Sequence, residues 1–411
     1  MIEVDIHQPK RQRTVKPPED NVFRMLILAD FGAEEVSRPV LVDRDNIEEL
    51  MGKWKVSATV PGAGKIFFES LDDFHPDELY RKLRLFQALR EAKIRLEDPE
   101  THERTVDQIF PLQVTPQASM DILRPSNLVD QILKGGEDPF QDYVRRLVAP
   151  YTVPRPDPKL SEMLAELDAS VAGHMRGILH APQFQMVEAA WRALDHVVRA
   201  VETGVELKIY IMDLPQRLFA GDMLRAKKLP DTLLHSLLET QDWNYICAAY
   251  TFGDSEHEIE TLGRTALLMD HAKTRFLAAA TPDFAKWQEP SAGLDELKQI
   301  PEIRQIGLAL PRWLVRAPYE EHQDFCWANP AFACARLIGE HRATGDHSLD
   351  IRGLPFHVRN GEATPCAEFL MTQTTAEKLM EVGFMPLISM KDQDWIRLAG
   401  FRALNGAPFL D

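Results

Sequence analysis

Apolar and polar positions along the chain follow two different periods. Continuous or alternating apolar runs of about four to eight residues predict strands, and apolar residues repeating every three or four positions predict helices. The expected strands are Val22–Ala29, Lys65–Glu69, Leu207–Met212, Tyr245–Tyr250, Phe276–Ala280, Ile306–Ala309 and Met385–Ser389. The expected helices are Asp45–Met51, His75–Glu97, Leu160–Leu179, Phe184–Val201, Glu256–His271, Asn329–Glu340, Thr375–Val382 and Asp394–Phe401. Because strands and helices alternate from residue 207 onward, the pattern predicts an α/β fold with a sheet packed between helices.

The first six residues form a short pattern of their own. Ile2, Val4 and Ile6 are separated by acidic residues, so their side chains would share one face of a strand. The charged, proline-containing segment Gln8–Asp20 follows and is expected to act as a tether. A frayed terminus is the alternative, because chain ends are poorly ordered unless something holds them.

Proline density indicates how the chain is divided. Residues 98–158 contain nine prolines, and helical patches are expected between them at Ser126–Leu133 and Pro139–Val148. We expect an N-terminal strand and tether in residues 1–20 and a small α/β module in residues 21–97. A linker with short helices would then occupy residues 98–141, and a larger α/β domain residues 142–411.

Composition narrows the class of protein without identifying an activity. The 411 residues include 47 Lys and Arg against 63 Asp and Glu, which gives a formal charge of −16. Such a chain is repelled by phosphate backbones, so nucleic acid is not an expected partner. The proportions of 45% hydrophobic and 27% charged residues are typical of a folded globular protein rather than a disordered one.

Cysteine usage and the lengths of apolar runs indicate a compartment. The four cysteines contain no Cys-x-x-Cys pair, and sparse thiols in a long chain favour a reducing environment. Apolar runs such as Met25–Ala29 and Phe276–Ala280 are far shorter than the roughly 20 residues of a membrane-spanning helix. Pro17–Asp20 occupies the place where a signal peptide would be apolar. We therefore expect a cytoplasmic protein without membrane insertion.

The stretch Gly62–Lys65 (GAGK) is similar to half of a phosphate-binding loop. The full motif needs a glycine where Thr59 stands and a Ser or Thr where Ile66 stands. Since both are missing, we interpret the stretch as a hairpin turn before the strand that begins at Lys65.

Ser255 follows an expected strand, in the sequence Gly253-Asp254-Ser255, and could in principle be a nucleophile. Such a serine needs a His and an Asp to activate it, and no Asp-x-x-His stands near the C-terminus; the one at Asp72–His75 lies upstream. Capping of the helix that begins near Glu256 is the simpler interpretation.

Metal-ligating and base-stacking patterns are also weak. His322 and Cys326 are spaced to share a helix face, but no further ligands complete a set of about four. Aromatic residues, including Trp191, Trp313, Trp327 and Trp395, stand among apolar neighbours and are expected in the core. The residues alone therefore predict no catalytic, cofactor-binding or metal site.

Several blocks resemble the two sheath proteins of bacterial type VI secretion systems. Residues 22–97 are similar to the small sheath subunit. The blocks that carry this similarity are FRMLILADFG (Phe23–Gly32), LVDRDNIEELM (Leu41–Met51) and FESLDDFHPDELYRKLRLFQALREAKIRL (Phe68–Leu96). The run from Ser70 to Pro76 followed by a helix is the most specific of these.

Residues 142–401 are similar to the large sheath subunit. Six ordered blocks carry this similarity, which makes it stronger than any one block would be. They are ILHAPQFQMVEAAWRALDHVV (Ile178–Val198), ETGVELKIYIMDL (Glu202–Leu214), GLALPRWLVRAPY (Gly307–Tyr319), FCWANPAFACARLI (Phe325–Ile338), PCAEFLMT (Pro365–Thr372) and GFMPLISMKDQD (Gly383–Asp394).

The resemblance implies a phage-tail-sheath-like fold in which both subunits are fused in one chain. It implies a structural protein without enzyme activity or cofactor, assembled around an inner tube whose ejection it drives by contraction. The implied partners are other sheath subunits, the inner tube, baseplate components and a disassembly ATPase of the AAA+ class. Sheath subunits exchange terminal strands between neighbouring sheets, and Ile2, Val4 and Ile6 suit that role.

The length of the C-terminal part leads to an alternative expectation. Large sheath subunits continue well past the Gly-Phe-x-Pro-Leu block, whereas this sequence ends at Asp411, 22 residues after Ser389. A short form of this kind is expected to lack the large subunit's C-terminal domain. The alternative function is therefore a non-contractile, sheath-derived adaptor or assembly factor of the same apparatus.

Overall fold

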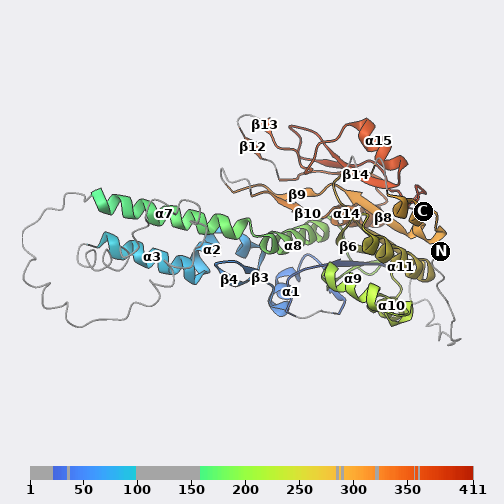
Figure 1. Cartoon of the computed structure of the whole chain (residues 1–411), viewed down its shortest axis with the longest axis horizontal. Helices are drawn as coiled ribbons and strands as arrows, with labels where there is room; N and C mark the ends of the chain where they lie inside the picture. Colours follow the sequence, from blue (N-terminus) through green and yellow to red (C-terminus); the bar gives the residue numbers. More distant parts are fainter. Residues whose placement is uncertain are drawn as a thin grey trace, which may run out of the picture.

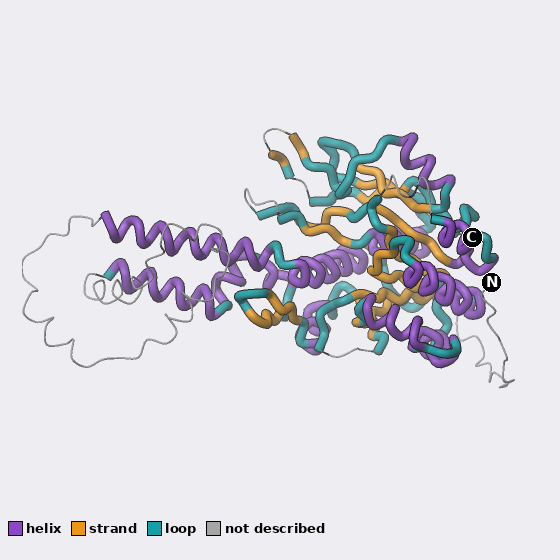
Figure 2. Tube along the Cα trace, in the orientation of Figure 1, coloured by secondary structure: helices purple, strands orange, loops and turns teal. Residues whose placement is uncertain are grey.

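The computed structural model describes residues 22–34, 38–98, 158–283, 287, 291–319, 324–355, 357–359 and 362–410. These residues form a body built on one large sheet, from which two long helices extend as an arm (Figures 1 and 2). The tether and the helical patches expected at Ser126–Leu133 and Pro139–Val148 lie outside the described residues.

The sheet of the body has nine strands in the order β11-β15-β14-β8-β7-β6-β1-β5-β2. Its central strands run parallel to one another; they are β14 (Phe384–Ser389), β8 (Ile306–Leu310), β7 (Arg275–Ala280), β6 (Tyr245–Phe252), β1 (Phe23–Ala29) and β5 (Leu207–Asp213). The end strands β2 (Val40–Val42), β15 (Ile396–Leu398) and β11 (Asp350–Ile351) are antiparallel to their neighbours. The α/β fold expected from the alternation of elements is confirmed.

Strand β1 lies inside this sheet, between β5 and β6, although residues 30–206 separate it from β5 in the sequence. Met25 and Ile27 enter one hydrophobic core, and Leu26 and Leu28 enter a second core on the opposite face. A parallel strand buried on both faces needs a continuous apolar run rather than an alternating one, which explains the sequence of this segment. Residues from the expected 21–97 module and the expected 142–411 domain thus share one sheet.

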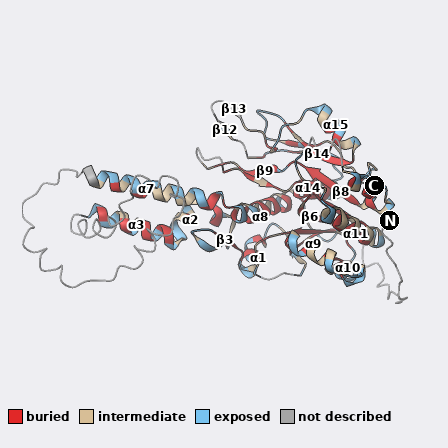
Figure 3. Cartoon of the chain, in the orientation of Figure 1, coloured by how far each residue is buried: buried red, intermediate tan, exposed pale blue. Residues whose placement is uncertain are grey.

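Helices cover both faces of the sheet. The first core lies under α1 (Ile47–Trp54), α8 (Pro182–Ala200) and α14 (Pro330–Thr344), and the second under α9 (Gln216–Arg225), α10 (Leu233–Thr240), α11 (Glu256–Ala272) and α13 (Ala292–Lys298). Figure 3 shows the buried residues gathered where these helices face the strands. Short 3₁₀ turns at Leu71–Phe74, Leu229–Asp231 and Pro301–Gln305 join longer elements.

The arm consists of α3 (Arg84–Glu97) and α7 (Pro158–Leu179), which lie side by side (Figure 1). The expectation of one continuous helix over His75–Glu97 is wrong at Leu83. Leu83 has extended backbone (φ −76°, ψ 130°), so α2 (Pro76–Lys82) ends there and α3 begins. The apolar spacing did not reveal this break, because Leu79 before it and Phe86 after it are both buried.

The C-terminal region adds short strands to the body. An antiparallel ribbon is formed by β9 (Trp313–Arg316) and β10 (Cys326–Ala328), and a smaller one by β12 (Val358–Arg359) and β13 (Glu362–Ala363). Helix α15 (Gln373–Glu381) packs against β14. The expected helix Asp394–Phe401 is wrong, since Ile396 and Leu398 are buried on either side of exposed Arg397 and form strand β15. That alternation has a period of two, which fits a strand paired with β14.

Candidate assembly interface

The two ends of the sheet are the places where a strand from another chain could add. The expected intersubunit strand, Ile2, Val4 and Ile6, lies outside the described residues. Among the described residues the sheet ends at β2 and at β11. An end strand presents unpaired N–H and C=O groups along one side, which is the chemistry that strand addition uses.

Strand β2 offers the more open of these two edges. It is only three residues long, pairs antiparallel with β5, and leaves Leu41 42% exposed. At the other end, β11 is two residues long and carries the charged Asp350, whose carboxylate accepts hydrogen bonds of 2.6 and 3.0 Å from Arg397 of β15. Charged side chains along an edge discourage further pairing.

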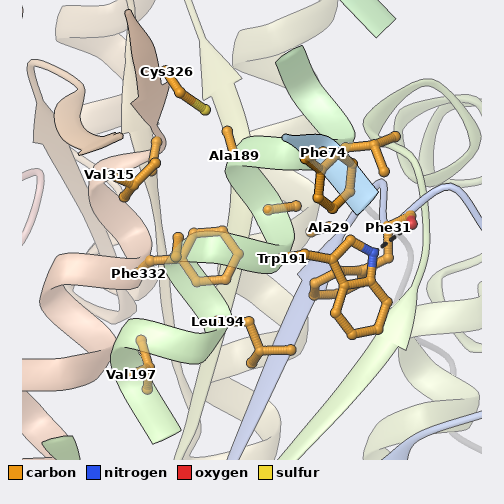
Figure 4. Packing of buried hydrophobic residues seen from close by; sticks show 14 of the residues in the cluster. Ala29, Phe31, Phe74, Ala189, Trp191, Leu194, Val197, Val315, Cys326 and Phe332 are labelled. Atoms are coloured by element: carbon orange, nitrogen blue, oxygen red, sulfur yellow. Dashed lines mark hydrogen bonds between the residues drawn. The ribbon is translucent and has the colours of Figure 1, made fainter. Parts of the chain in front are cut away.

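The loop after β1 connects the sheet to the elements on its first face. The Asp213 carboxylate, at the end of β5, accepts the Phe31 N–H at 2.5 Å, and Trp191 Nε1 of α8 donates to the Phe31 carbonyl at 2.9 Å (Figure 4). Gly32 has a φ of +75°, and a Cβ there would lie 2.6 Å from the Ser57 carbonyl oxygen. Only glycine fits this position without a shift of the loop.

Electrostatics at this loop are governed by burial. Asp213 is 3% exposed, and burial raises the pKa of its carboxyl to about 7, with the nearby Asp30 acting in the same direction. Burial also raises the pKa of Asp30, although the Gly32 N–H and Arg217 act against that shift. Tyr250 of β6 lies in the same neighbourhood, and its hydroxyl donates to the Leu214 carbonyl at 2.7 Å.

A buried ion network joins α8 to the β9–β10 ribbon. Arg316 of β9 binds Glu188 of α8 in a bidentate pair, with Nε–Oε1 at 2.6 Å and Nη2–Oε2 at 2.9 Å. Arg192 donates to the same Glu188 at 2.8 Å, and Arg316 also reaches Asp324 at 3.3 Å. Burial opposes the charge of Arg316, but Glu188 beside it outweighs this effect and raises the pKa of the guanidinium.

Sequence reasoning missed this network, although one signal was present. Glu188 stands on the apolar stripe of α8, between Phe184 and Trp191, and none of these three side chains is exposed. A glutamate on a buried helix face requires a partner, because a buried charge is costly unless it is paired. That partner could not be identified from the sequence, since Arg316 is far away in the chain.

The motifs considered for chemistry have structural roles. Gly62 and Gly64 both have positive φ and form the turn of the hairpin between β3 (Ser57–Val60) and β4 (Gly64–Phe67), as expected. Ser255 is the N-cap of α11, and its hydroxyl hydrogen-bonds Glu258 in a capping box, which confirms the capping interpretation.

The expected helix face for His322 and Cys326 does not form. Cys326 is buried on strand β10, and His322 lies outside the described residues. All four cysteines are free and buried. Trp191 and Trp313 are fully buried as expected, but Trp327 and Trp395 are only partly buried, so their expected place in the core is wrong. In the part of the chain that the structure describes, no three His, Cys, Asp or Glu side chains gather so as to hold a metal ion. Each described helix is too short or too polar to traverse a lipid bilayer.

Part of the sequence is similar to tail sheath proteins. Residues 161–292, which run from α7 through β7 to the start of α13, match the family described as EvpB/VC_A0108, tail sheath N-terminal domain. The chain is also similar to the type VI secretion system sheath protein TssC1 of Pseudomonas aeruginosa strain PAO1, with 26% identity over 305 residues. This match covers 60% of the chain and spans 61% of the length of that relative.

Proposed function

We propose that the chain is a structural subunit of a type VI secretion contractile sheath, which assembles around an inner tube and drives its ejection. The observation that carries this proposal is the match of residues 161–292 to a tail sheath domain. The matched residues supply β5, β6 and β7, helices α9, α10 and α11 of the second core, and α8 of the first, so the similarity falls on the centre of the body. The similarity to TssC1 supports the same assignment.

We further propose that the chain fuses a small-subunit-like module, residues 21–97, to a large-subunit-like domain, residues 142–411. The position of β1 between β5 and β6 supports this proposal, because the first module then completes the sheet of the second. Joining the two in one chain fixes their ratio at one to one and raises the effective concentration of each for the other.

Exchange of the N-terminal strand belongs to the same proposal. Ile2, Val4 and Ile6 would add to the open edge of a neighbouring subunit's sheet, where main-chain hydrogen bonds give affinity and alternate side chains give register. The implied partners are other sheath subunits, the inner tube, the baseplate and an AAA+ disassembly ATPase. A structural rather than catalytic role and a cytoplasmic location follow from the proposed function.

Negative-stain electron microscopy of the purified chain tests this proposal. We expect tubes or stacked rings from the intact chain and their loss in a variant lacking residues 1–8. A triple variant, Ile2→Asp with Val4→Asp and Ile6→Asp, should act like the truncation. Its matched control, Glu3→Gln with Asp5→Asn, keeps the apolar face and should assemble normally.

Two results would contradict different parts of the proposal. Small discrete particles from the intact chain, alone and with tube and baseplate components, would contradict a sheath lattice. Normal tubes from the truncated variant would leave the sheath function standing and remove the role of the N-terminal strand.

A further inference from the structure

Helix α9 and the loop after it carry a cluster of cations on the second face of the sheet. Phe219 and Met223 anchor the helix in the second core, and its outer side is exposed. Arg217, Arg225, Lys227 and Lys228 are all exposed there. No described carboxylate lies within ion-pair distance of any of them, although Arg217 acts electrostatically on the Asp30 carboxyl in the loop after β1. The one acidic side chain of α9, Asp222, is already used, because it accepts the Leu233 N–H at 2.7 Å.

The placement of these cations favours a contact surface over an ordinary solvated helix face. Arg217 stands in the first turn of α9, where the helix dipole disfavours a positive charge. Arg217 and Arg225 lie on one face of the helix with Gly221 between them, and the exposed Leu218 lies beside them. A cationic ridge with an exposed apolar side chain beside it is suited to an acidic protein surface.

The opposite face of the sheet carries negative charge near the same edge. Helix α1 packs in the first core. Glu48 and Glu49 in its first turn are exposed, and so is Asp45, two residues before the helix. Glu49 pairs with Lys53, and Asp45 lies 3.7 Å from Arg44. Counted over residues 43–53, the four acids and two bases leave a net charge of −2, against +3 over residues 217–228. Figure 1 shows α1 and α9 along the same border of the body.

We propose that the cationic ridge of α9 docks on the acidic α1 surface of a second copy of this chain. This inference rests on the proposed function, which requires many copies to pack together. Copies with a net charge of −16 repel one another at long range, so a stable contact must place positive charge against negative. Because the two surfaces lie on opposite faces of the sheet, the contact is heterologous and stacks copies head to tail rather than closing a dimer.

Charge reversal with cross-complementation tests the contact. The ridge variant, Arg217→Glu with Arg225→Glu, and the α1 variant, Asp45→Lys with Glu48→Lys, should each raise the protein concentration needed for assembly by about tenfold or more. An equimolar mixture of the two variants should assemble again, because the reversed ridge of one variant then meets the reversed α1 surface of the other, and their two unreversed surfaces meet in the next contact. Assembly is measured by sedimentation and electron microscopy of the full chain.

The controls separate a specific contact from a general charge effect. Glu202→Lys with Glu206→Lys matches the α1 variant in net charge at exposed positions elsewhere and should not impair assembly. Raising salt from 0.1 to 1 M should weaken wild-type assembly, since it shortens the screening length from about 10 Å to about 3 Å.

The outcomes distinguish this inference from the proposed function. If the variants assemble like the wild type, or if their mixture fails to restore assembly, the α9–α1 contact is wrong and the sheath function stands. If the variants assemble normally but lose binding to another anionic component, the ridge serves that partner instead and the inference is overturned. If the wild type remains monomeric at every salt concentration, both fail together.

Discussion

Two ion pairs of similar length have very different surroundings in the body and in the arm. In the body, Arg316 and Glu188 are 2.6 Å apart, with side chains 7% and 0% exposed. In the arm, Lys93 of α3 and Asp168 of α7 are 2.7 Å apart, with side chains 37% and 59% exposed. Judged by distance alone, the two ion pairs would be expected to contribute equally to the stability of the fold.

Burial determines how much stability is lost when one partner of each ion pair is removed. Removing one partner of the body pair leaves a charge in a low-dielectric interior, whereas an exposed charge that loses its partner is solvated by water. The body therefore depends on a connected network around Glu188, and the arm depends on the apolar stripe between its two helices. Figure 3 shows the same contrast in the distribution of buried residues.

The largest expected effect comes from breaking the body network. Glu188→Ala leaves Arg316 and Arg192 without their shared carboxylate, so we expect a loss of about 3–5 kcal/mol in the free energy of unfolding. Urea denaturation of the full chain measures this loss. The matched control is Asp195→Ala on the same helix, whose partner Arg199 is 66% exposed; it should cost about 1 kcal/mol or less. Equal losses would mean that burial does not separate the two kinds of pair.

A second prediction concerns Asp213, a buried carboxyl bound by a backbone N–H group. Its pKa is raised from the ordinary value of 3.8 to about 7, so the folded state holds a proton that the unfolded state has released. Stability from this group is present below about pH 4 and is lost as the pH rises toward 7. Relative to the wild type, Asp213→Asn should therefore gain about 1 kcal/mol for each pH unit between pH 4 and 7.

Urea midpoints of the two proteins across that range check this prediction, and a difference independent of pH would contradict it. Asp30→Asn serves as a second variant. Because Asp30 helps to raise the pKa of Asp213, removing its charge should move the transition to lower pH without abolishing it. Arg217 and Tyr250 also face this pair and are unchanged in both variants.

The smallest expected effect is in the arm. Lys93→Ala removes the exposed pair with Asp168 and should change the free energy of unfolding by about 0.2–1 kcal/mol. By contrast, Leu89→Ala on the same helix removes a side chain that is 1% exposed and should cost about 2–5 kcal/mol. If the two losses were similar, the arm would be held by its ion pair rather than by its apolar stripe.

Local patterns predicted the regular elements well where one period dominated. The parallel strands and the helices α8, α11 and α14 appear close to their expected bounds, because each has a clear apolar face or run. The break at Leu83 and the strand at Ile396–Leu398 were missed. In both places the apolar spacing was compatible with a helix. The structure was decided instead by the pairing of Ile396–Leu398 with β14 and by the change of chain direction at Leu83, and the local spacing contains neither.

The candidate interface was predictable only in part. Alternation at Ile2, Val4 and Ile6 predicted a strand for exchange, and that remains a prediction. The cations of α9 are visible in the sequence, but their exposure and their lack of described carboxylate partners are not. Which face of the sheet each charged helix covers depends on the order of the strands, which no local pattern contains.

By itself, the sequence determined the α/β class, the buried character of β1, and the turn and cap roles of Gly62–Lys65 and Ser255. These features depend on neighbouring residues, through side-chain period and backbone preference. Only the tertiary structure placed β1 between β5 and β6 and brought Glu188 to Arg316. Such contacts join residues more than a hundred positions apart, and their free energy comes from burial and pairing that exist only once the chain has folded.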